Sequence, residues 1–381
     1  MVKSPWFFRL IKVGLVFALA WYVTRQVETR DRLFFEENEQ RIEWTGKLEG
    51  NWQETDWVFH RDIETAAGED RSFSSSELPH PIEIRPGFFT LLKGIRLPFY
   101  FLGIGSWLIL LLIVTKRWQL LLEAAEVPLS YRRALRLCFI GYFFNNVMPG
   151  LTGGDLVRAV MVARDAKEKR ARAAVTVLVD RLVGLMGLLI LGAVVLSFAP
   201  PQFAGGEETL ARVRWAVFAF LACGFLGTWA YQSPSVRKTL GLDALLRRLP
   251  FRDQFQSLDE AVTIYNTRRG TLFLTLLLSI ALQVFGVLAF YSMGIALGST
   301  LSALDNFAVF PIVQTISSVP VAPAGWGIGE TLYGRFFSGL GSTFTLGVAV
   351  SILFRLTTQV GFGLLGGLAW LSSRSSNQQN S

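Results

Sequence analysis

The sequence has little of the material from which most catalytic and metal-binding sites are built. Its 381 residues include only two cysteines and two histidines. Cys138 and Cys223 both lie in apolar stretches, so they fit neither a disulfide framework nor a zinc site. His60 and His80 stand in a polar segment without a cluster of ligands around them. We therefore predict no metal and no cofactor, and the sequence offers no Ser-His-Asp or Cys-His set for nucleophilic catalysis.

Charge is also scarce. Only 17% of the residues are charged, 51% are hydrophobic, and the mean hydropathy is +0.40. The charged residues crowd into residues 25–96, 116–136, 155–172 and 232–270, with long apolar runs between them. Apolar runs of about 18 residues or more are typical of membrane-spanning helices. The composition predicts an all-α polytopic membrane protein.

The net charge of +8 does not indicate a nucleic-acid partner. Residues 25–96 hold ten Lys and Arg against fifteen Asp and Glu, so the positive charge is concentrated in the short loops between apolar runs. An excess of basic residues in such loops marks the cytoplasmic side of a membrane protein. We expect a multi-pass protein of the cell (inner) membrane that binds no nucleic acid.

The charge pattern divides the chain into four parts. Residues 1–24 form an N-terminal span or signal anchor, residues 25–96 an exported acidic insert, residues 97–371 the transmembrane domain, and residues 372–381 a cytoplasmic tail. Both termini are then cytoplasmic. About six full spans are expected, over residues 13–23, 97–115, 173–199, 213–231, 271–297 and 343–371. Residues 18–20 also resemble a signal-peptidase site, which leaves open whether the first span is retained.

Two polar segments have weaker patterns. In the exported insert, Trp44, Trp52 and Trp57 alternate with charged residues, which favours a small, strand-rich domain. It could serve as a structural cap or as a ligand-binding module. Apolar residues between Phe255 and Tyr265 recur at helical spacing, which predicts an amphipathic helix on the membrane surface.

Two helix breaks occur at corresponding places in the transmembrane domain. Residues 143–155 and residues 317–330 each run from an apolar stretch through Pro and Gly to one carboxylate, Asp155 or Glu330. The apolar stretches around them, such as residues 134–148, are short for a full crossing. The pattern predicts two re-entrant hairpins that enter from opposite sides as parts of an inverted repeat.

Charged residues inside apolar helices are costly and usually face a cavity or a partner. Arginine suits a phosphate because its planar guanidinium donates two parallel hydrogen bonds, and glycines let backbone amides approach a ligand. The alternative is that the carboxylates simply pair with the arginines and hold helices together. The predicted substrate-binding residues are Asn146, Gly153, Gly154, Asp155, Arg158, Asp180, Arg181, Gly327, Gly329, Glu330, Arg335 and Arg355.

These motifs resemble a known family. Gly153-Gly154-Asp155 with Arg158, followed by Asp180-Arg181 and by the glycine-rich run that ends at Glu330, is similar to the transmembrane region of lysylphosphatidylglycerol synthases. The resemblance covers about residues 97–371 and implies a flippase-like domain that handles polar-headed lipids. It also implies that some members carry a following aminoacyltransferase domain. Since the sequence ends ten residues after the last predicted span, we expect a member without that domain and predict that the chain is not an enzyme.

Two functions follow from these observations. The first is a translocator that moves a polar-headed, anionic or aminoacylated lipid between leaflets. The second is an accessory subunit that presents membrane lipid to a partner lipid-modifying enzyme. The sequence gives no oligomeric state.

Overall fold

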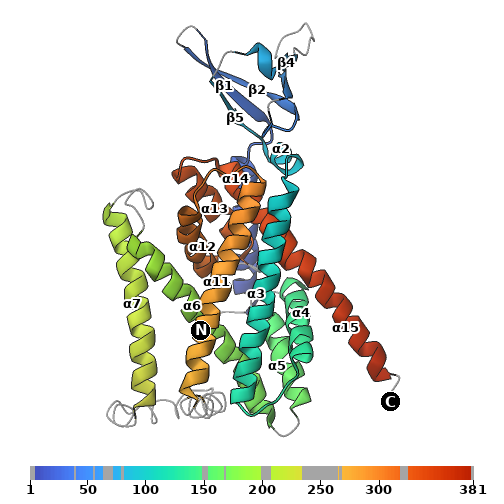
Figure 1. Ribbon diagram of the computed structural model, residues 1–381, viewed down its shortest axis with the longest axis vertical. Coiled ribbons are helices and arrows are strands. Elements are labelled where there is room, and N and C mark those ends of the chain that lie inside the picture. The colour runs from blue at the N-terminus through green and yellow to red at the C-terminus, as the bar shows by residue number, and fades with distance from the viewer. Residues whose placement is uncertain are drawn as a thin grey trace.

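In the protein, a bundle of helices carries a small β-sheet at one end (Figure 1). The computed structural model describes residues 5–37, 40–54, 56–62, 72–78, 81–147, 153–166, 169–198, 207–233, 265, 268–317 and 325–378. The strands are β1 (Asp31–Glu37), β2 (Gln40–Gly50), β3 (Trp57–Arg61), β4 (Ser72–Ser74) and β5 (Ile82–Arg85). The helices are α1 (Pro5–Gln26), α2 (Phe88–Lys93), α3 (Leu97–Ala124), α4 (Tyr131–Val147), α5 (Gly153–Asp165), α6 (Arg170–Phe198), α7 (Glu207–Gln232), α11 (Arg269–Ala296), α12 (Ala303–Ser317), α13 (Ile328–Gly339), α14 (Phe344–Arg355) and α15 (Phe362–Gln378).

The sheet explains the alternating pattern of the insert. Its strands lie in the order β4-β3-β2-β1-β5, and all neighbours are antiparallel. Successive side chains of a strand point to opposite faces, so Leu33 and Phe35 enter the apolar side while Phe34 faces away. The buried core of this side is completed by Leu48, Trp57, Phe59 and Leu78. The prediction of a strand-rich domain is confirmed.

The sheet is tied to the helical bundle by one buried carboxylate. Asp31 accepts hydrogen bonds from Leu48 N (2.6 Å), Gly87 N (2.7 Å) and Thr90 Oγ1 (3.0 Å). It therefore joins β1 and β2 to the chain that enters α2. Charge-assisted bonds of this kind are roughly twice as strong as neutral ones.

The turn between β2 and β3 packs on the bundle itself. Trp52 lies against Gly94 and against Gly298, the glycine that follows α11, so closely that a Cβ at Gly298 would overlap the indole ring. Gly298 also has a φ of +81°, which favours glycine. Nearby, Glu28 N donates to Thr345 Oγ1 on α14 at 2.9 Å. The sheet is thus held by the ends of two helices of the bundle.

Four helices in the described part of the chain are long and apolar enough to cross a membrane. They are Leu97–Ala124, Arg170–Phe198, Arg269–Ala296 and Phe344–Leu371. The helical membrane class is therefore confirmed. The two other predicted spans fall in α1 and α7, which do not reach the same length and apolarity, so the count of six stays a prediction.

Two pairs of shorter helices lie where the broken hairpins were expected. α5 has 13 residues and α13 has 12, about 20 and 18 Å at 1.5 Å per residue, which is short of a hydrocarbon core of about 30 Å. In Figure 1 the α12–α13 pair lies in the end of the bundle beside the sheet, and α4–α5 lies in the opposite end. The Pro-Gly tips, residues 148–152 and 318–324, lie outside the described residues, as does most of the predicted amphipathic helix.

The last span is not a uniform α-helix. Between α14 and α15, residues Leu356–Gly361 form a π-helical segment. α15 then leaves the bundle obliquely toward the end away from the sheet (Figure 1). It packs on α4 through Gly366, where a Cβ would overlap the carbonyl oxygen of Phe139. The absence of a side chain at residue 366 is what lets the two helices approach.

Candidate functional site

One cluster of charges forms where α5 and α6 meet. Asp155 and Arg158 lie one turn apart on α5, with Arg158 Nη1 3.4 Å from Asp155 Oδ1. From α6, Arg181 Nη1 donates to Asp155 Oδ2 at 2.7 Å, and Arg158 Nη2 lies 3.5 Å from Asp180 Oδ2. The structure therefore brings four predicted site residues together. They form carboxylate–arginine pairs, which is also what the alternative of a purely structural role predicts.

Arg117 of α3 completes this first cluster, and the sequence analysis missed it. Its Nε donates to Asp180 Oδ1 at 2.9 Å and its Nη1 donates to Ser279 Oγ at 2.8 Å. Only 4% of its side chain is exposed. The predicted span stops at residue 115, just before Lys116 and Arg117, whereas α3 continues without a break to Ala124. The uninterrupted apolar pattern after Arg117 was the available signal.

A cavity of about 160 Å³ opens beside the first cluster. It is lined by Val114, Cys138, Gly141, Tyr142, Asn145, Asp155 and Arg158. Its volume is several times the roughly 30 Å³ that one water occupies in the liquid. Arg158 Nε is buried and has no hydrogen-bond partner among the described residues. The guanidinium carbon of Arg158 lies 4.2 Å from the centre of the Trp118 ring, and this contact holds the side chain that lines the cavity.

A second, more deeply buried cluster joins α13 to α14. Arg355 Nε lies 2.9 Å from Glu330 Oε1, and each side chain is only 4% exposed. Glu330 also accepts from Gly327 N at 2.6 Å and from Ser351 Oγ at 3.2 Å. Arg355 Nη2 donates to Gly325 O at 3.2 Å. The cluster therefore closes the start of α13 onto the middle of the last span.

Two hydroxyl groups are buried near the second cluster without a hydrogen-bond partner among the described residues. They belong to Ser317, at the end of α12, and to Tyr333 of α13. A buried unpaired hydroxyl costs roughly 1–3 kcal/mol. Most buried side-chain polar groups have a hydrogen-bond partner, and those without one occur where the protein holds water, an ion or a functional group.

The predicted glycines serve close packing. Gly153 is buried at the start of α5. Gly154 N donates to Asn145 Oδ1 at 2.9 Å, and a Cβ there would overlap the carbonyl of Gly141. A Cβ at Gly329 would overlap the Arg355 guanidinium, and Gly327 has a φ of +85°. The glycines thus let charged groups and helices approach each other.

Two predicted site residues lie away from both clusters. Arg335 is exposed and donates to Tyr22 Oη on α1 at 2.9 Å. Residues five apart on a helix are separated by about 140°, so Arg335 cannot share the face of Glu330. Asn146 donates its amide to backbone carbonyls of α4 and of the π-helical segment.

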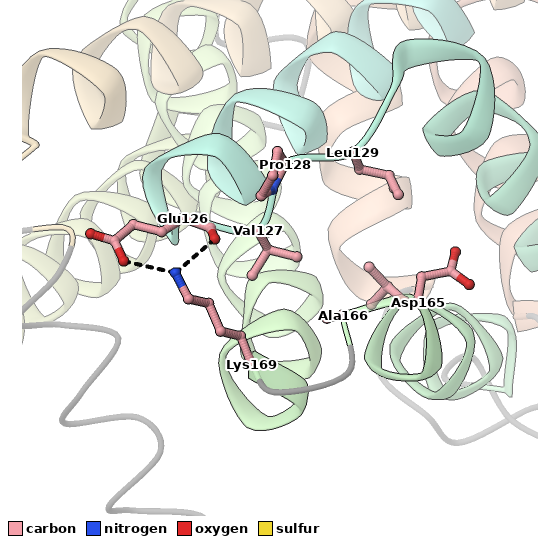
Figure 2. Close-up of a pocket in the computed structure, with 8 residues that line it drawn as sticks. Glu126, Val127, Pro128, Leu129, Asp165, Ala166 and Lys169 are labelled. Atoms are coloured by element: carbon pink, nitrogen blue, oxygen red, sulfur yellow. Dashed lines mark hydrogen bonds and ion pairs between the residues drawn. The ribbon is translucent and has the colours of Figure 1, made fainter.

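A larger cavity, of about 430 Å³, contains none of the predicted residues (Figure 2). It lies between the turn after α3 and the end of α5, and Lys169 Nζ donates there to the carboxylate (2.9 Å) and carbonyl (3.1 Å) of Glu126. The hydrogen bond from Lys169 and its positive charge lower the pKa of the Glu126 carboxyl. In this larger cavity Lys169 pairs with Glu126, and Asp165 pairs with Arg133 from outside the lining. We place the candidate site at the smaller cavity because Arg158 Nε, which has no partner among the described residues, belongs to a residue that lines it.

The described residues include no group of three or more His, Cys, Asp and Glu side chains placed to hold a metal ion. The charged clusters instead consist of arginines and carboxylates that join the short helices α5 and α13 to helices long enough to cross a membrane. A bundle of apolar helices with charged clusters inside it is typical of a helical membrane protein with an internal polar site.

Comparison with known proteins identifies the family. Residues 87–366 match the family described as the lysylphosphatidylglycerol synthase TM region. Because the match covers more than half of the chain, the protein belongs to this family, and the predicted resemblance is confirmed. The match contains both clusters and begins just after β5, so the sheet lies before it.

Several archaeal proteins are similar to this chain. A UPF0104 membrane protein of Pyrococcus horikoshii is 25% identical over 298 residues, which cover 72% of this chain and 87% of the relative. A UPF0104 membrane protein of Methanothermobacter thermautotrophicus is 22% identical over 262 residues, covering 65% and 77%. A third, from Methanocaldococcus jannaschii, is 20% identical over 270 residues, covering 68% and 80%.

Proposed function

We propose that this protein moves lipids with an anionic or aminoacylated headgroup between the two leaflets of a membrane. The observation that carries the proposal is the cavity beside Arg158, whose buried Nε has no partner among the described residues. Phosphate and carboxylate oxygens are the acceptors that match a guanidinium best, and a phosphate is the one that a lipid headgroup supplies. Asp155 lines the same cavity and would face a cationic group, such as an amine on the headgroup.

Membership in a lysylphosphatidylglycerol synthase transmembrane family supports a lipid substrate. The two clusters lie on different helix pairs, one on α5 and one on α13, and these pairs occupy opposite ends of the bundle (Figure 1). This arrangement supports a path with two polar stations. In the proposed cycle the headgroup meets the first cluster and then the second, while the acyl chains stay in the lipid. Re-entrant hairpins are tolerated where they line such a polar cavity.

The orientation is part of the same proposal. Arg132, Arg133 and Lys169 lie at the end of the bundle that carries α4 and α5, and the sheet lies at the other end. From the positive-inside rule we propose that the sheet lies outside the cell membrane and that both termini lie in the cytoplasm. A cysteine introduced at Ser76 in place of serine should react with a membrane-impermeant maleimide in intact cells, and one at Arg132 should not.

Exchange between leaflets tests the function directly. The purified protein is reconstituted into vesicles with a trace of phosphatidylglycerol or phosphatidylcholine labelled with a fluorophore, and dithionite then bleaches the outer leaflet. We expect exchange of labelled phosphatidylglycerol well above that in protein-free vesicles and slower exchange of phosphatidylcholine. Exchange of neither lipid, nor of a lysylated phosphatidylglycerol, above protein-free vesicles would contradict the proposal.

A further inference from the structure

The π-helical segment Leu356–Gly361 begins directly after Arg355. A π turn inserts an extra residue into a helix and interrupts its regular i to i−4 hydrogen bonds, and such turns are frequent at functional sites. Here Thr358 Oγ1 donates to Phe354 O at 2.6 Å, and Tyr100 Oη lies 3.0 Å from Thr357 Oγ1. The segment is therefore fixed by specific contacts on both sides.

Asn146, at the end of α4, supplies the contact with the other half of the molecule. Its Nδ2 donates to Gln359 O in the π-helical segment at 2.7 Å and to Tyr142 O at 3.1 Å. Gln359 lies 213 residues away along the chain. Asn146 stands immediately before the undescribed tip of the first hairpin, and Gln359 stands one turn after Arg355 of the second cluster.

Gly363 makes room for this bond. A Cβ at residue 363 would overlap Asn146 Nδ2 and lie 3.5 Å from Tyr142 O. Gly361, the last residue of the π-helical segment, has space for a Cβ, since the nearest atom would be Leu356 O at 3.5 Å. Substitution of Gly363 therefore disturbs the Asn146 amide, and the same substitution at Gly361 does not, so the two positions serve as test and control.

We infer that Asn146 is a positioning residue that couples the first hairpin to the Glu330–Arg355 ion pair through the π-helical segment. Each residue of an α-helix turns the chain by about 100°. If the π-helical segment became regular α-helix, α15 would therefore rotate relative to α14. Either the glycines of α15 would then turn away from α4, or Arg355 would turn away from Glu330. Because Asn146 bonds to the π form, a movement of the first hairpin changes how firmly Arg355 is presented to Glu330.

Hydrogen exchange of backbone amides tests the coupling in the purified full-length protein in lipid nanodiscs, without a transport assay. Asn146→Leu keeps the branching at Cγ but cannot donate, and Gly363→Ala displaces the same amide from the other side. In both variants we expect the first turn of α13, which follows Gly327, to exchange about fivefold faster, the ratio that one ordinary hydrogen bond supports. Gly361→Ala is the control and should leave α13 unchanged.

The result that would overturn the inference is faster exchange confined to α4 and α5 in both variants. Size-exclusion chromatography shows that each variant is folded, and Gly363→Ala serves as the second probe if Asn146→Leu is not. The coupling itself does not depend on the proposed function; only its role in lipid transport rests on that function. If wild-type vesicles show no lipid exchange while α13 still responds to Asn146→Leu, the proposed function fails and the coupling stands. If lipid exchange is present and α13 does not respond, the coupling fails alone.

Discussion

Replacing Glu330 with glutamine removes one charge from the Glu330–Arg355 pair and keeps the volume of the side chain nearly unchanged. Each side chain is 4% exposed, and the Nε to Oε1 distance is 2.9 Å. Breaking a buried pair from one side leaves an uncompensated charge in a poorly polarisable surrounding, which costs about 3–5 kcal/mol. We expect Glu330→Gln and Arg355→Met to lose stability to this extent.

Thermal unfolding in detergent, followed by the fluorescence of the 11 tryptophans, measures the loss. A cost of 3–5 kcal/mol should lower the melting temperature by on the order of 5–10 °C. Glu208→Gln is the control, because Glu208 and its partner Arg212 are 81% and 75% exposed and such pairs contribute about 1 kcal/mol or less. The double variant Glu330→Gln, Arg355→Met removes both charges. Its melting temperature should recover at least half of the decrease that Glu330→Gln alone causes.

The double variant also separates the two roles of the pair. If the pair only holds α13 against α14, the double variant should keep lipid exchange together with its stability. If the pair lines the lipid path, as we propose, stability returns and lipid exchange does not. A single variant that melts within 1 °C of wild type would refute the reasoning, because the pair would then not be desolvated.

Three further predictions concern packing and backbone conformation. Trp52→Ala should release the sheet from the bundle, since the ring packs on Gly94 and Gly298; protease cleavage between the sheet and α3 should become faster, and unchanged cleavage would show that Asp31 suffices. Gly366→Ala should lower the melting temperature, because overpacking costs about 1–3 kcal/mol. Gly105→Ala, which has open space around it in α3, is the control and should raise the melting temperature slightly. Equal effects of the two substitutions would contradict the close contact of Gly366 with Phe139. Glu126 has a φ of +57°, so Glu126→Gly should be more stable than Glu126→Ala by about 1 kcal/mol in the same melting experiment, and the reverse order would refute a left-handed conformation there.

Local sequence signals were enough for several elements. The alternation around Trp44 and Trp57 predicted strands because a half-buried strand repeats every two residues. Short apolar stretches ending at Pro and Gly predicted the positions of α4 and α12, since neither residue continues a helix well. The contact between Asp155 and Arg158 agrees with their spacing, because residues three apart share a helix face.

Other features depend on partners far away in the sequence. Arg117 looks like the end of a span until Asp180 and Ser279 are placed beside it by α6 and α11. The π-helical segment leaves no composition signal, because it is held by Tyr100 and Asn146 from other helices. The position of Arg335 outside the second cluster could have been predicted from the sequence, since its five-residue separation from Glu330 places it on another face of the helix.

The most direct test compares Arg158→Gln with Arg164→Gln in vesicles at equal protein content. Arg158 lines the cavity, whereas Arg164 lies exposed on the same helix. Loss of the guanidinium that would hold the phosphate should slow exchange of labelled phosphatidylglycerol by about tenfold or more, and Arg164→Gln should exchange it at the wild-type rate. Equal rates in the two variants, with both proteins folded, would contradict the claim that a lipid headgroup passes the Arg158 cavity.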